Sequence, residues 1–111
     1  MLPKKYRLPA SQFAAVKSRG QLLQTPLFGC LVLPSFPNLP IRFGFIVSTK
    51  LSSKATIRNH TRRLLREAVR SLLPRLSRGY DFLILAKHPL LTARLDQISH
   101  TFHEILVPYL N

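Results

Sequence analysis

Acidic side chains are scarce in this sequence, whose 111 residues include four Asp and Glu against 17 Lys and Arg. The acids are far apart in the chain: Glu67, Asp81, Asp96 and Glu104. General acid/base catalysis by protein carboxylates needs such groups in pairs. The sequence therefore argues against a hydrolase that works through a carboxylate dyad.

Cysteine and long apolar runs are also lacking. Cys30 is the only cysteine, which excludes an intrachain disulfide and a zinc site built from several thiolates. Its apolar neighbours favour a small buried side chain over a nucleophile. The low cysteine count indicates a reducing, cytoplasmic compartment. The first 20 residues contain five Lys and Arg but no apolar core of a signal peptide. No run elsewhere approaches the length of a membrane span, so we expect neither secretion nor a membrane partner.

Positive charge dominates what is present. The formal net charge is +13 with histidine neutral, and 46% of the residues are hydrophobic, which is enough for a core. We expect one domain over residues 1–111. A polyanion relieves the self-repulsion of such a chain, so nucleic acid is the expected partner and no small-molecule substrate is predicted.

Hydrophobic patterning predicts the element order helix, strand, strand, helix, strand, helix. The first helix is expected at 9–19, since Pro9 suits its first turn and Gly20 the position after its end. Apolar runs with β-branched and aromatic members predict strands at 27–33, 41–48 and 80–86. A second helix is expected from Ser52 or Ser53 to residue 73, and a third over 95–109. The stripe expected to face the core on the second helix consists of Ile57, Thr61, Leu64, Leu65, Ala68 and Leu72.

The helix predicted after Ser52 carries an unusual row of cations. Residues 50–70 contain seven Lys and Arg and one acid, Glu67. Most recur every four residues: Lys50, Lys54, Arg58, Arg62, Arg66 and Arg70, with Arg63 added. Residues four apart lie about 6 Å from one another along a helix face, close to the spacing of phosphates on one nucleic-acid strand. Arginine binds phosphate bidentately, and Asn59 and His60 add hydrogen-bonding groups to the row. A merely solvated helix face would interleave Glu with these cations, so the row indicates a functional surface.

Residues 41–67, IRFGFIVSTKLSSKATIRNHTRRLLRE, resemble the protein subunit of bacterial ribonuclease P. That family combines an Arg-x-Gly strand and a Val-Ser-x-Lys segment with a helix motif Arg-Asn-Arg-x-Lys-Arg-x-x-Arg. The matching positions are Arg42, Gly44, Val47, Ser48, Lys50, Arg58, Asn59, Arg63 and Arg66, with Arg62 in place of the family lysine. His60 and Thr49 depart from the pattern. The segments YRLPASQFAAVKSRG and GYDFLILAK extend the resemblance to most of the chain.

The resemblance implies an α/β (α+β) two-layer sandwich whose small mixed sheet contains a left-handed strand-helix-strand crossover, although such crossovers are generally right-handed. It also implies an endonuclease subunit that binds a catalytic RNA and holds the 5′ leader of precursor tRNA between the first helix and the sheet. The RNA is expected to hold Mg²⁺ and perform the hydrolysis, with no catalytic or metal-binding residue on the protein. The expected RNA-binding residues are Arg42, Lys50, Lys54, Arg58, Asn59, His60, Arg62, Arg63, Arg66 and Arg70. Those expected at the leader are Phe13, Lys17, Phe43 and Phe45.

Two other functions remain open from the sequence. A ribosomal or other structural RNA-binding protein could use the same basic helix without any processing reaction. A nuclease that acts without RNA is the third alternative, and it would require a specific Asp or Glu for magnesium-dependent cleavage.

Overall fold

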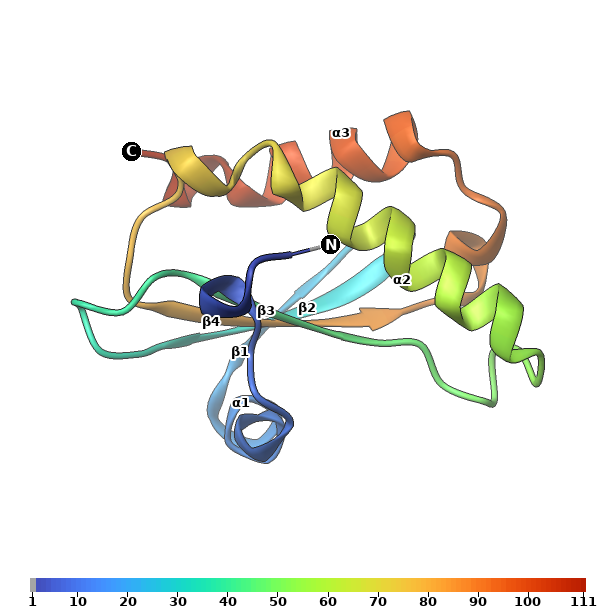
Figure 1. Ribbon diagram of the computed structural model, residues 1–111, viewed down its shortest axis with the longest axis horizontal. Coiled ribbons are helices and arrows are strands. Elements are labelled where there is room, and N and C mark those ends of the chain that lie inside the picture. Colours follow the sequence, from blue (N-terminus) through green and yellow to red (C-terminus); the bar gives the residue numbers. More distant parts are fainter. Residues whose placement is uncertain (1) are drawn as a thin grey trace.

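One mixed sheet separates helices α2 and α3 from helix α1 in the computed structural model, which describes residues 2–111 (Figure 1). The strands are β1 (Gln21–Gln24), β2 (Phe28–Pro34), β3 (Arg42–Ile46) and β4 (Tyr80–Ala86). The α-helices are α1 (Phe13–Arg19), α2 (Ala55–Arg70) and α3 (Leu95–Leu106). The predicted α+β class is confirmed, and α1 covers part of the second sheet face. No helix within residues 2–111 is both long and apolar enough to cross a membrane.

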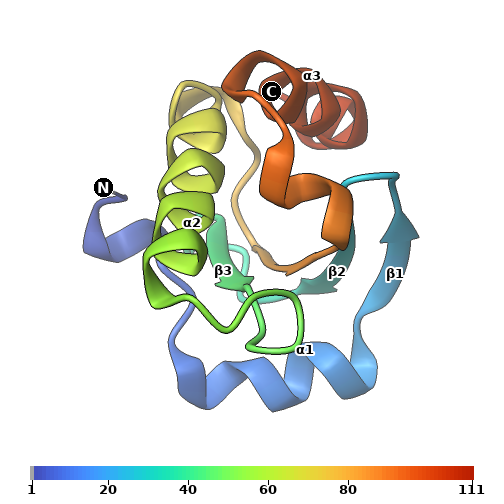
Figure 2. The ribbon, with the colours of Figure 1, turned by 90° about the vertical axis from the view of Figure 1, so that its right-hand side faces the viewer.

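The strand order is β1-β2-β4-β3, and β3 and β4 are the parallel pair. Helix α2 joins them, and Figures 1 and 2 show it on the same side of the sheet as α3. Seen with α2 in front and β3 pointing upward, β4 lies to the left of β3, so the crossover is left-handed. The expected crossover is thus present, in the hand that parallel units rarely adopt.

Strand β1 was not predicted. It is short, begins and ends with glutamine and has Leu22 49% exposed, so it lacks the apolar signal of the other strands. Pairing with β2 defines it, and the turn between them is held by Thr25, whose Oγ1 accepts from the Phe28 amide at 2.9 Å. The three α-helices are also shorter than the sequence predicts, because 3-10 turns occupy Ala10–Gln12, Leu73–Arg75 and Val107–Tyr109.

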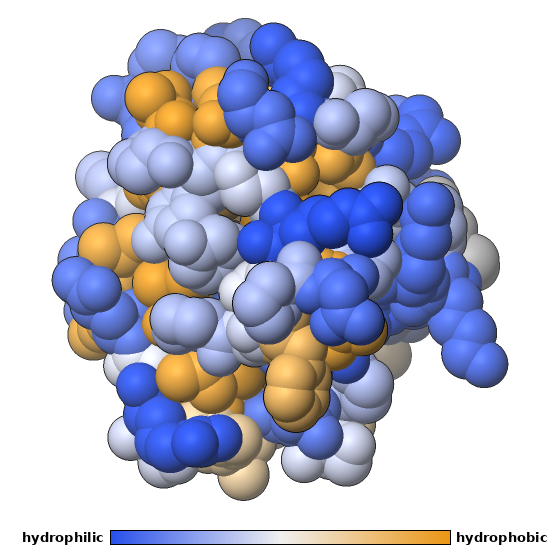
Figure 3. Space-filling view, turned by 90° about the vertical axis from the view of Figure 1, so that its left-hand side faces the viewer, coloured by the Kyte–Doolittle hydropathy of each residue, from blue (hydrophilic) through white to orange (hydrophobic). Residues whose placement is uncertain are grey.

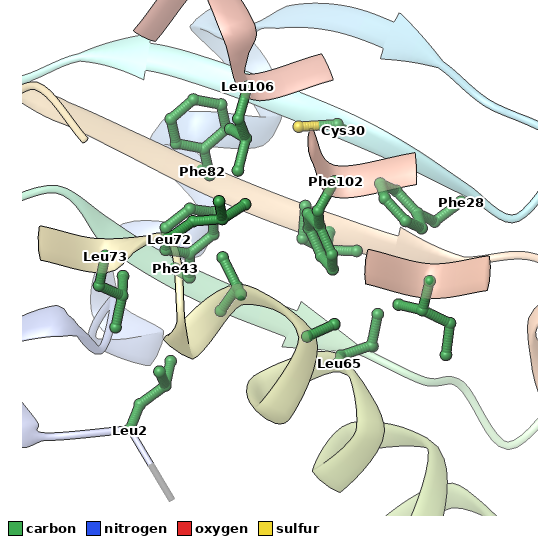
Figure 4. Close-up of a cluster of buried hydrophobic side chains, with 14 of the residues drawn as sticks. Leu2, Phe28, Cys30, Phe43, Leu65, Leu72, Leu73, Phe82, Phe102 and Leu106 are labelled. Atoms are coloured by element: carbon green, nitrogen blue, oxygen red, sulfur yellow. The ribbon is translucent and has the colours of Figure 1, made fainter. Parts of the chain in front are cut away.

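The main core lies between the sheet and helices α2 and α3. Phe43 and Phe82 stack with ring centroids 5.1 Å apart, and Phe28 lies 4.8 Å from Phe102 of α3 (Figure 4). Leu65 supplies the α2 side of this cluster. Burial of each such side chain contributes about 1.5–3 kcal/mol to stability. The α2 helix is therefore fixed by its apolar face, which leaves its other face available.

Candidate nucleic-acid interface

Helix α2 buries a narrow stripe. Thr61, Leu65, Ala68 and Val69 are its buried residues, and the Thr61 hydroxyl donates to the Ile57 carbonyl at 3.0 Å. The stripe was expected to begin at Ile57, but this side chain is 38% exposed. The first helical turn therefore projects beyond the core, and most of the helix circumference is left for polar groups.

Two of the α2 arginines hold the loop that precedes the helix. Arg58 Nη1 donates to the Ser52 carbonyl at 2.9 Å, and Arg62 Nη2 reaches the Val47 carbonyl at 3.4 Å. Arg62 Nη1 also donates to Asn59 Oδ1 at 2.9 Å. These bonds orient the guanidinium groups and leave their positive charges unneutralised.

The outer α2 arginines differ in their partners. Arg63 Nη2 lies 3.1 Å from His60 Nδ1, which accepts this bond because a guanidinium group only donates. Arg70 forms an ion pair with Glu67 at 2.6 Å. Arg66 has no hydrogen-bond or ion-pair partner among residues 2–111. The middle of the helix thus presents positive charge that no acid offsets.

A shallow hollow of about 460 Å³ runs along the outer face of α2. Thr56, Asn59, His60, Arg63 and Arg66 line it, and we call it the α2 hollow. It combines two guanidinium groups with a neutral amide, an imidazole and a hydroxyl. Guanidinium groups bind phosphate oxygens, and the neutral groups can bind base edges or 2′-hydroxyls. Lys50 and Lys54, both exposed, extend the basic surface ahead of the helix.

A second depression, of about 200 Å³, lies at the outer edge of β3, and we call it the β3 groove. The chain before α1 forms one side, where the Leu8 amide donates to the Phe43 carbonyl at 2.9 Å. Arg62 and Arg66 of α2 face it from the other side of the sheet edge. Further lining residues are Leu2, Arg7, Leu8, Phe13, Phe43, Gly44 and Phe45. Arg66 therefore lines both depressions.

Gly44 permits the close approach of α1 at this groove. A Cβ at this position would lie 2.6 Å from the Phe13 ring, which is closer than any real contact. The ring of Phe13 therefore packs directly against the β3 backbone while remaining partly exposed. An aromatic surface thus lies beside arginine side chains, which suits a single nucleic-acid strand.

The structure separates the four residues expected at the leader. Phe13 and Phe45 are partly exposed in the β3 groove, and Lys17 is exposed one turn further along α1. The expectation that Phe43 contacts the leader is corrected. Its side chain is 2% exposed and stacks between two other aromatic rings, so its faces are not accessible to a base. Arg7 was not predicted at this groove, because only its pairing with β3 places it there.

Arg42, also expected to bind RNA, is paired with an acid and keeps 19% of its side chain exposed. Its Nε and Nη2 donate to the two carboxylate oxygens of Asp81, each at 2.8 Å. The hydrogen bond to Asp81 raises the pKa of Arg42 above its usual value, although partial burial opposes this. Alternation along β3 places Arg42 with Gly44 on the α1 side of the sheet, away from α2.

Each of the four acids has a cationic or imidazole partner. Besides Arg42–Asp81 and Arg70–Glu67, Arg94 contacts Asp96 at 3.3 Å and His100 contacts Glu104 at 3.1 Å. No group of three or more His, Cys, Asp or Glu within the described chain is arranged to hold a metal ion. The interface is thus basic and aromatic, without an acidic centre.

Comparisons with known proteins point to one family. The family model described as Ribonuclease P matches residues 2–109. The chain is 31% identical over 105 residues to the ribonuclease P protein component of a Picosynechococcus species, covering 94% of this chain and 87% of that protein. It is 40% identical over 85 residues to that of Chloroflexus aurantiacus, covering 76% of this chain and 62% of that protein.

Solved structures show the same fold. The Staphylococcus aureus RNase P protein mutant with defective mRNA degradation activity matches with a TM-score of 0.83 at 22% identity, covering 95% of this chain and 88% of that one. The Thermotoga maritima RNase P protein matches with a TM-score of 0.79 at 22% identity, covering 95% and 98%. With a matching sequence model over nearly the whole chain and this shared fold, the chain belongs to the family of bacterial ribonuclease P protein components, which are subunits of an endoribonuclease and partners of ribonuclease P RNA.

Proposed function

We propose that the α2 hollow binds the catalytic RNA of ribonuclease P and that the β3 groove holds the single-stranded 5′ leader of precursor tRNA during tRNA maturation in the cytoplasm. The observation that carries this proposal is the position of Arg66, which lacks an acidic partner within residues 2–111 and lines both depressions. One guanidinium presents several donors in a planar fork, so it can contact phosphates on either side.

The two depressions suit different RNA conformations. The α2 hollow is the larger of the two, its lining residues are all polar or basic, and its cations and amide fit the backbone and edges of a folded RNA. The β3 groove is narrower and contains Phe13 and Phe45 beside Arg62 and Arg66. Bases of a single strand can stack on aromatic rings while arginines bind the phosphates, whereas a paired helix hides its bases.

Phosphodiester hydrolysis itself is assigned to the RNA. Hard cations such as Mg²⁺ prefer several oxygen ligands, and metal-assisted hydrolysis needs the ion fixed close to the substrate. The protein's donor set does not fit such a site, since its four carboxylates are scattered and each has a basic partner. The RNA would then hold the magnesium and position the nucleophile, and the protein would contribute binding.

Reconstitution tests this assignment. The full chain is mixed with ribonuclease P RNA at low magnesium, and cleavage of precursor tRNA is compared with each component alone. We expect stimulation by the protein together with the RNA and no cleavage by the protein alone. If the protein binds RNA but does not stimulate cleavage, it is a structural RNA-binding protein in function. Cleavage by the protein alone, lost on replacing one acid, would contradict the assignment of the chemistry.

A further inference from the structure

A third hollow lies where the start of α2 faces the 3-10 turn η4 (His88–Thr92). Figure 2 shows this turn, in orange, beside the first turns of α2, in green. The hollow has a volume of about 540 Å³, larger than that of the α2 hollow or the β3 groove. We call it the η4 hollow; among its lining residues are Leu51, Ser52, Thr56, Ile57, His60 and Leu91.

The η4 hollow is neutral on a strongly basic protein. None of the Lys and Arg side chains within residues 2–111 lines it, although 17 of the 111 residues are basic. Arginines line both the α2 hollow and the β3 groove. At the opposite end of the molecule, where Figure 3 shows hydrophilic side chains interleaved with apolar patches, two smaller hollows each contain two basic side chains. The η4 hollow therefore suits an uncharged ligand better than a phosphate group.

Apolar side chains from three segments converge in the η4 hollow. Ile57, on the first turn of α2, is 38% exposed, and Leu51 and Leu91 are partly exposed on the loop before α2 and on η4. The bond from Arg58 Nη1 to the Ser52 carbonyl fixes the loop that carries Leu51. A single exposed apolar side chain needs no explanation, but a cluster of them marks a binding surface. Covering this cluster with a flat apolar ligand would remove it from water.

Neutral hydrogen-bonding groups surround the apolar cluster. His60 Nδ1 accepts from Arg63, whereas His60 Nε2 makes no hydrogen bond with residues 2–111. The Thr56 hydroxyl likewise has no partner in the described chain. The Ser52 hydroxyl accepts from the Lys54 amide at 3.3 Å and keeps its own proton to donate. An apolar surface bordered by neutral donors and acceptors is the environment that proteins offer to an unstacked nucleobase.

The η4 hollow adjoins the α2 hollow. Thr56 and His60 line both, and they lie one helical turn apart on α2. Arg63, three residues beyond His60, lines the α2 hollow alone of the two. A nucleotide whose phosphate is bound by Arg63 can thus place its base on the other side of His60. His60 departs from the Arg-Asn-Arg pattern, and its imidazole keeps the boundary between the hollows free of a guanidinium group.

We propose that the η4 hollow binds an unpaired nucleobase of the ribonuclease P RNA, so that the protein recognises one base beside the phosphates bound in the α2 hollow. Ile57 and Leu91 pack on the base, and His60 Nε2 hydrogen-bonds to its edge. This inference rests on the proposed binding of that RNA by the α2 hollow, to which it adds recognition of a base.

Footprinting identifies the base. Complexes of the full chain with ribonuclease P RNA are treated with dimethyl sulfate and a carbodiimide, which modify the Watson–Crick edges of unpaired bases. We expect the wild-type protein to protect one unpaired base that stays reactive with Ile57→Ala, while protection of the RNA backbone from hydroxyl radicals is the same for both proteins. Val107→Ala, a truncation of a 51% exposed side chain just after α3, is the matched control and should protect the base as wild type does.

Affinity measurements separate a base contact from charge. Ile57→Ala should lower RNA affinity about three- to tenfold without changing the slope of log affinity against log salt, because no phosphate contact is lost. An abasic nucleotide in place of the protected one should weaken wild-type binding by a similar factor and Ile57→Ala binding hardly further, as two partners of one contact require. Because Ile57 is partly exposed, the variant should unfold at nearly the wild-type temperature.

Two substitutions test the role of His60. His60→Gln keeps a neutral donor and acceptor, so the abasic replacement should still weaken its RNA binding. His60→Arg adds a cation at the boundary of the two hollows, so its salt slope should be steeper by about 0.7–0.9 and the abasic replacement should matter less.

The outcomes that overturn the inference are distinct. If Ile57→Ala keeps wild-type affinity and footprint while Arg66→Ala loses affinity, the η4 hollow does not bind RNA and the function of the α2 hollow stands. A shallower salt slope for Ile57→Ala would assign a phosphate to the hollow, and a dimer that Ile57→Ala abolishes without a change in RNA affinity would assign it to a second copy of the chain. If neither Ile57→Ala nor Arg66→Ala changes RNA affinity, the proposed function fails as well.

Discussion

Replacing Arg66 with alanine should weaken RNA binding more than any other single change on α2. The side chain lines both the α2 hollow and the β3 groove and has no acidic partner within residues 2–111. A charge-assisted hydrogen bond contributes about 1.5–3 kcal/mol, so Arg66→Ala should lower RNA affinity by at least about tenfold. Loss of one phosphate contact should also make the slope of log affinity against log salt shallower by about 0.7–0.9.

Arg94→Ala is the matched control. It changes the formal net charge from +13 by the same single unit, but Arg94 lies at the start of α3 beside Asp96. Fluorescence-anisotropy titrations of labelled ribonuclease P RNA with both variants, at 50 and 200 mM salt, separate contact from total charge. The ratio of wild-type to Arg66→Ala affinity should shrink about threefold between these conditions, whereas Arg94→Ala should parallel wild type.

Equal losses of affinity and equal salt slopes for Arg66→Ala and Arg94→Ala would refute the reasoning. RNA binding would then depend on the summed charge of the protein, and neither depression would be a dedicated site.

Three further predictions concern stability. Gly44→Ala places a methyl group 2.6 Å from the Phe13 ring and should destabilise the protein by about 1–3 kcal/mol in thermal unfolding. Gly29→Ala is the control, because its added methyl has no neighbour closer than 3.6 Å, and it should cost far less. Similar losses of stability in the two variants would show that the close approach of Phe13 to Gly44 is unimportant. Asp81→Asn removes the negative charge and one of the two oxygens that accept from Arg42, so it should cost about 2–4 kcal/mol in urea unfolding. Adding Arg42→Met should recover most of this loss, and an unaltered midpoint for the single variant would contradict the argument. Burial raises the pKa of the Cys30 thiol to about 12, so above pH 9 the unfolded chain loses this proton before the native protein does. The free energy of unfolding should therefore fall by up to about 1.4 kcal/mol per pH unit between pH 9 and 12, relative to Cys30→Ala, and a parallel pH dependence of the two proteins would disprove it.

The sequence predicted the features that depend on local pattern. Continuous apolar runs located β2, β3 and β4, and the spacing of Leu65 and Ala68 placed the buried stripe of α2. Strand β1 was not predicted, because this short polar segment forms a strand only through its pairing with β2. The left-handed crossover could be expected from family resemblance alone, since local pattern does not determine the hand of a connection.

Site residues were predictable where charge was periodic and less so where tertiary contacts decide. The α2 row needed only sequence spacing. Arg42 shares the family motif, yet its register opposite Asp81 gives its guanidinium an internal partner. Phe43 and Phe45 lie two residues apart, so the strand pattern places them on the same face of β3. Only packing against Phe82 distinguishes the buried ring of Phe43 from the accessible ring of Phe45. Arg7 required knowledge that the chain before α1 returns to β3.

The position of Arg66 has a thermodynamic consequence for the assembled enzyme. On the proposed function, one side chain contacts the RNA subunit on one side and the substrate leader on the other, so ordering it for one ligand changes the cost of binding the second. Linkage is reciprocal: whatever factor the RNA subunit adds to leader affinity, the leader returns to the affinity of the protein for the RNA. Substrate binding would then strengthen or loosen the ribonucleoprotein itself, and Arg66 would be a place where the stability of the complex and the recognition of its substrate are set together.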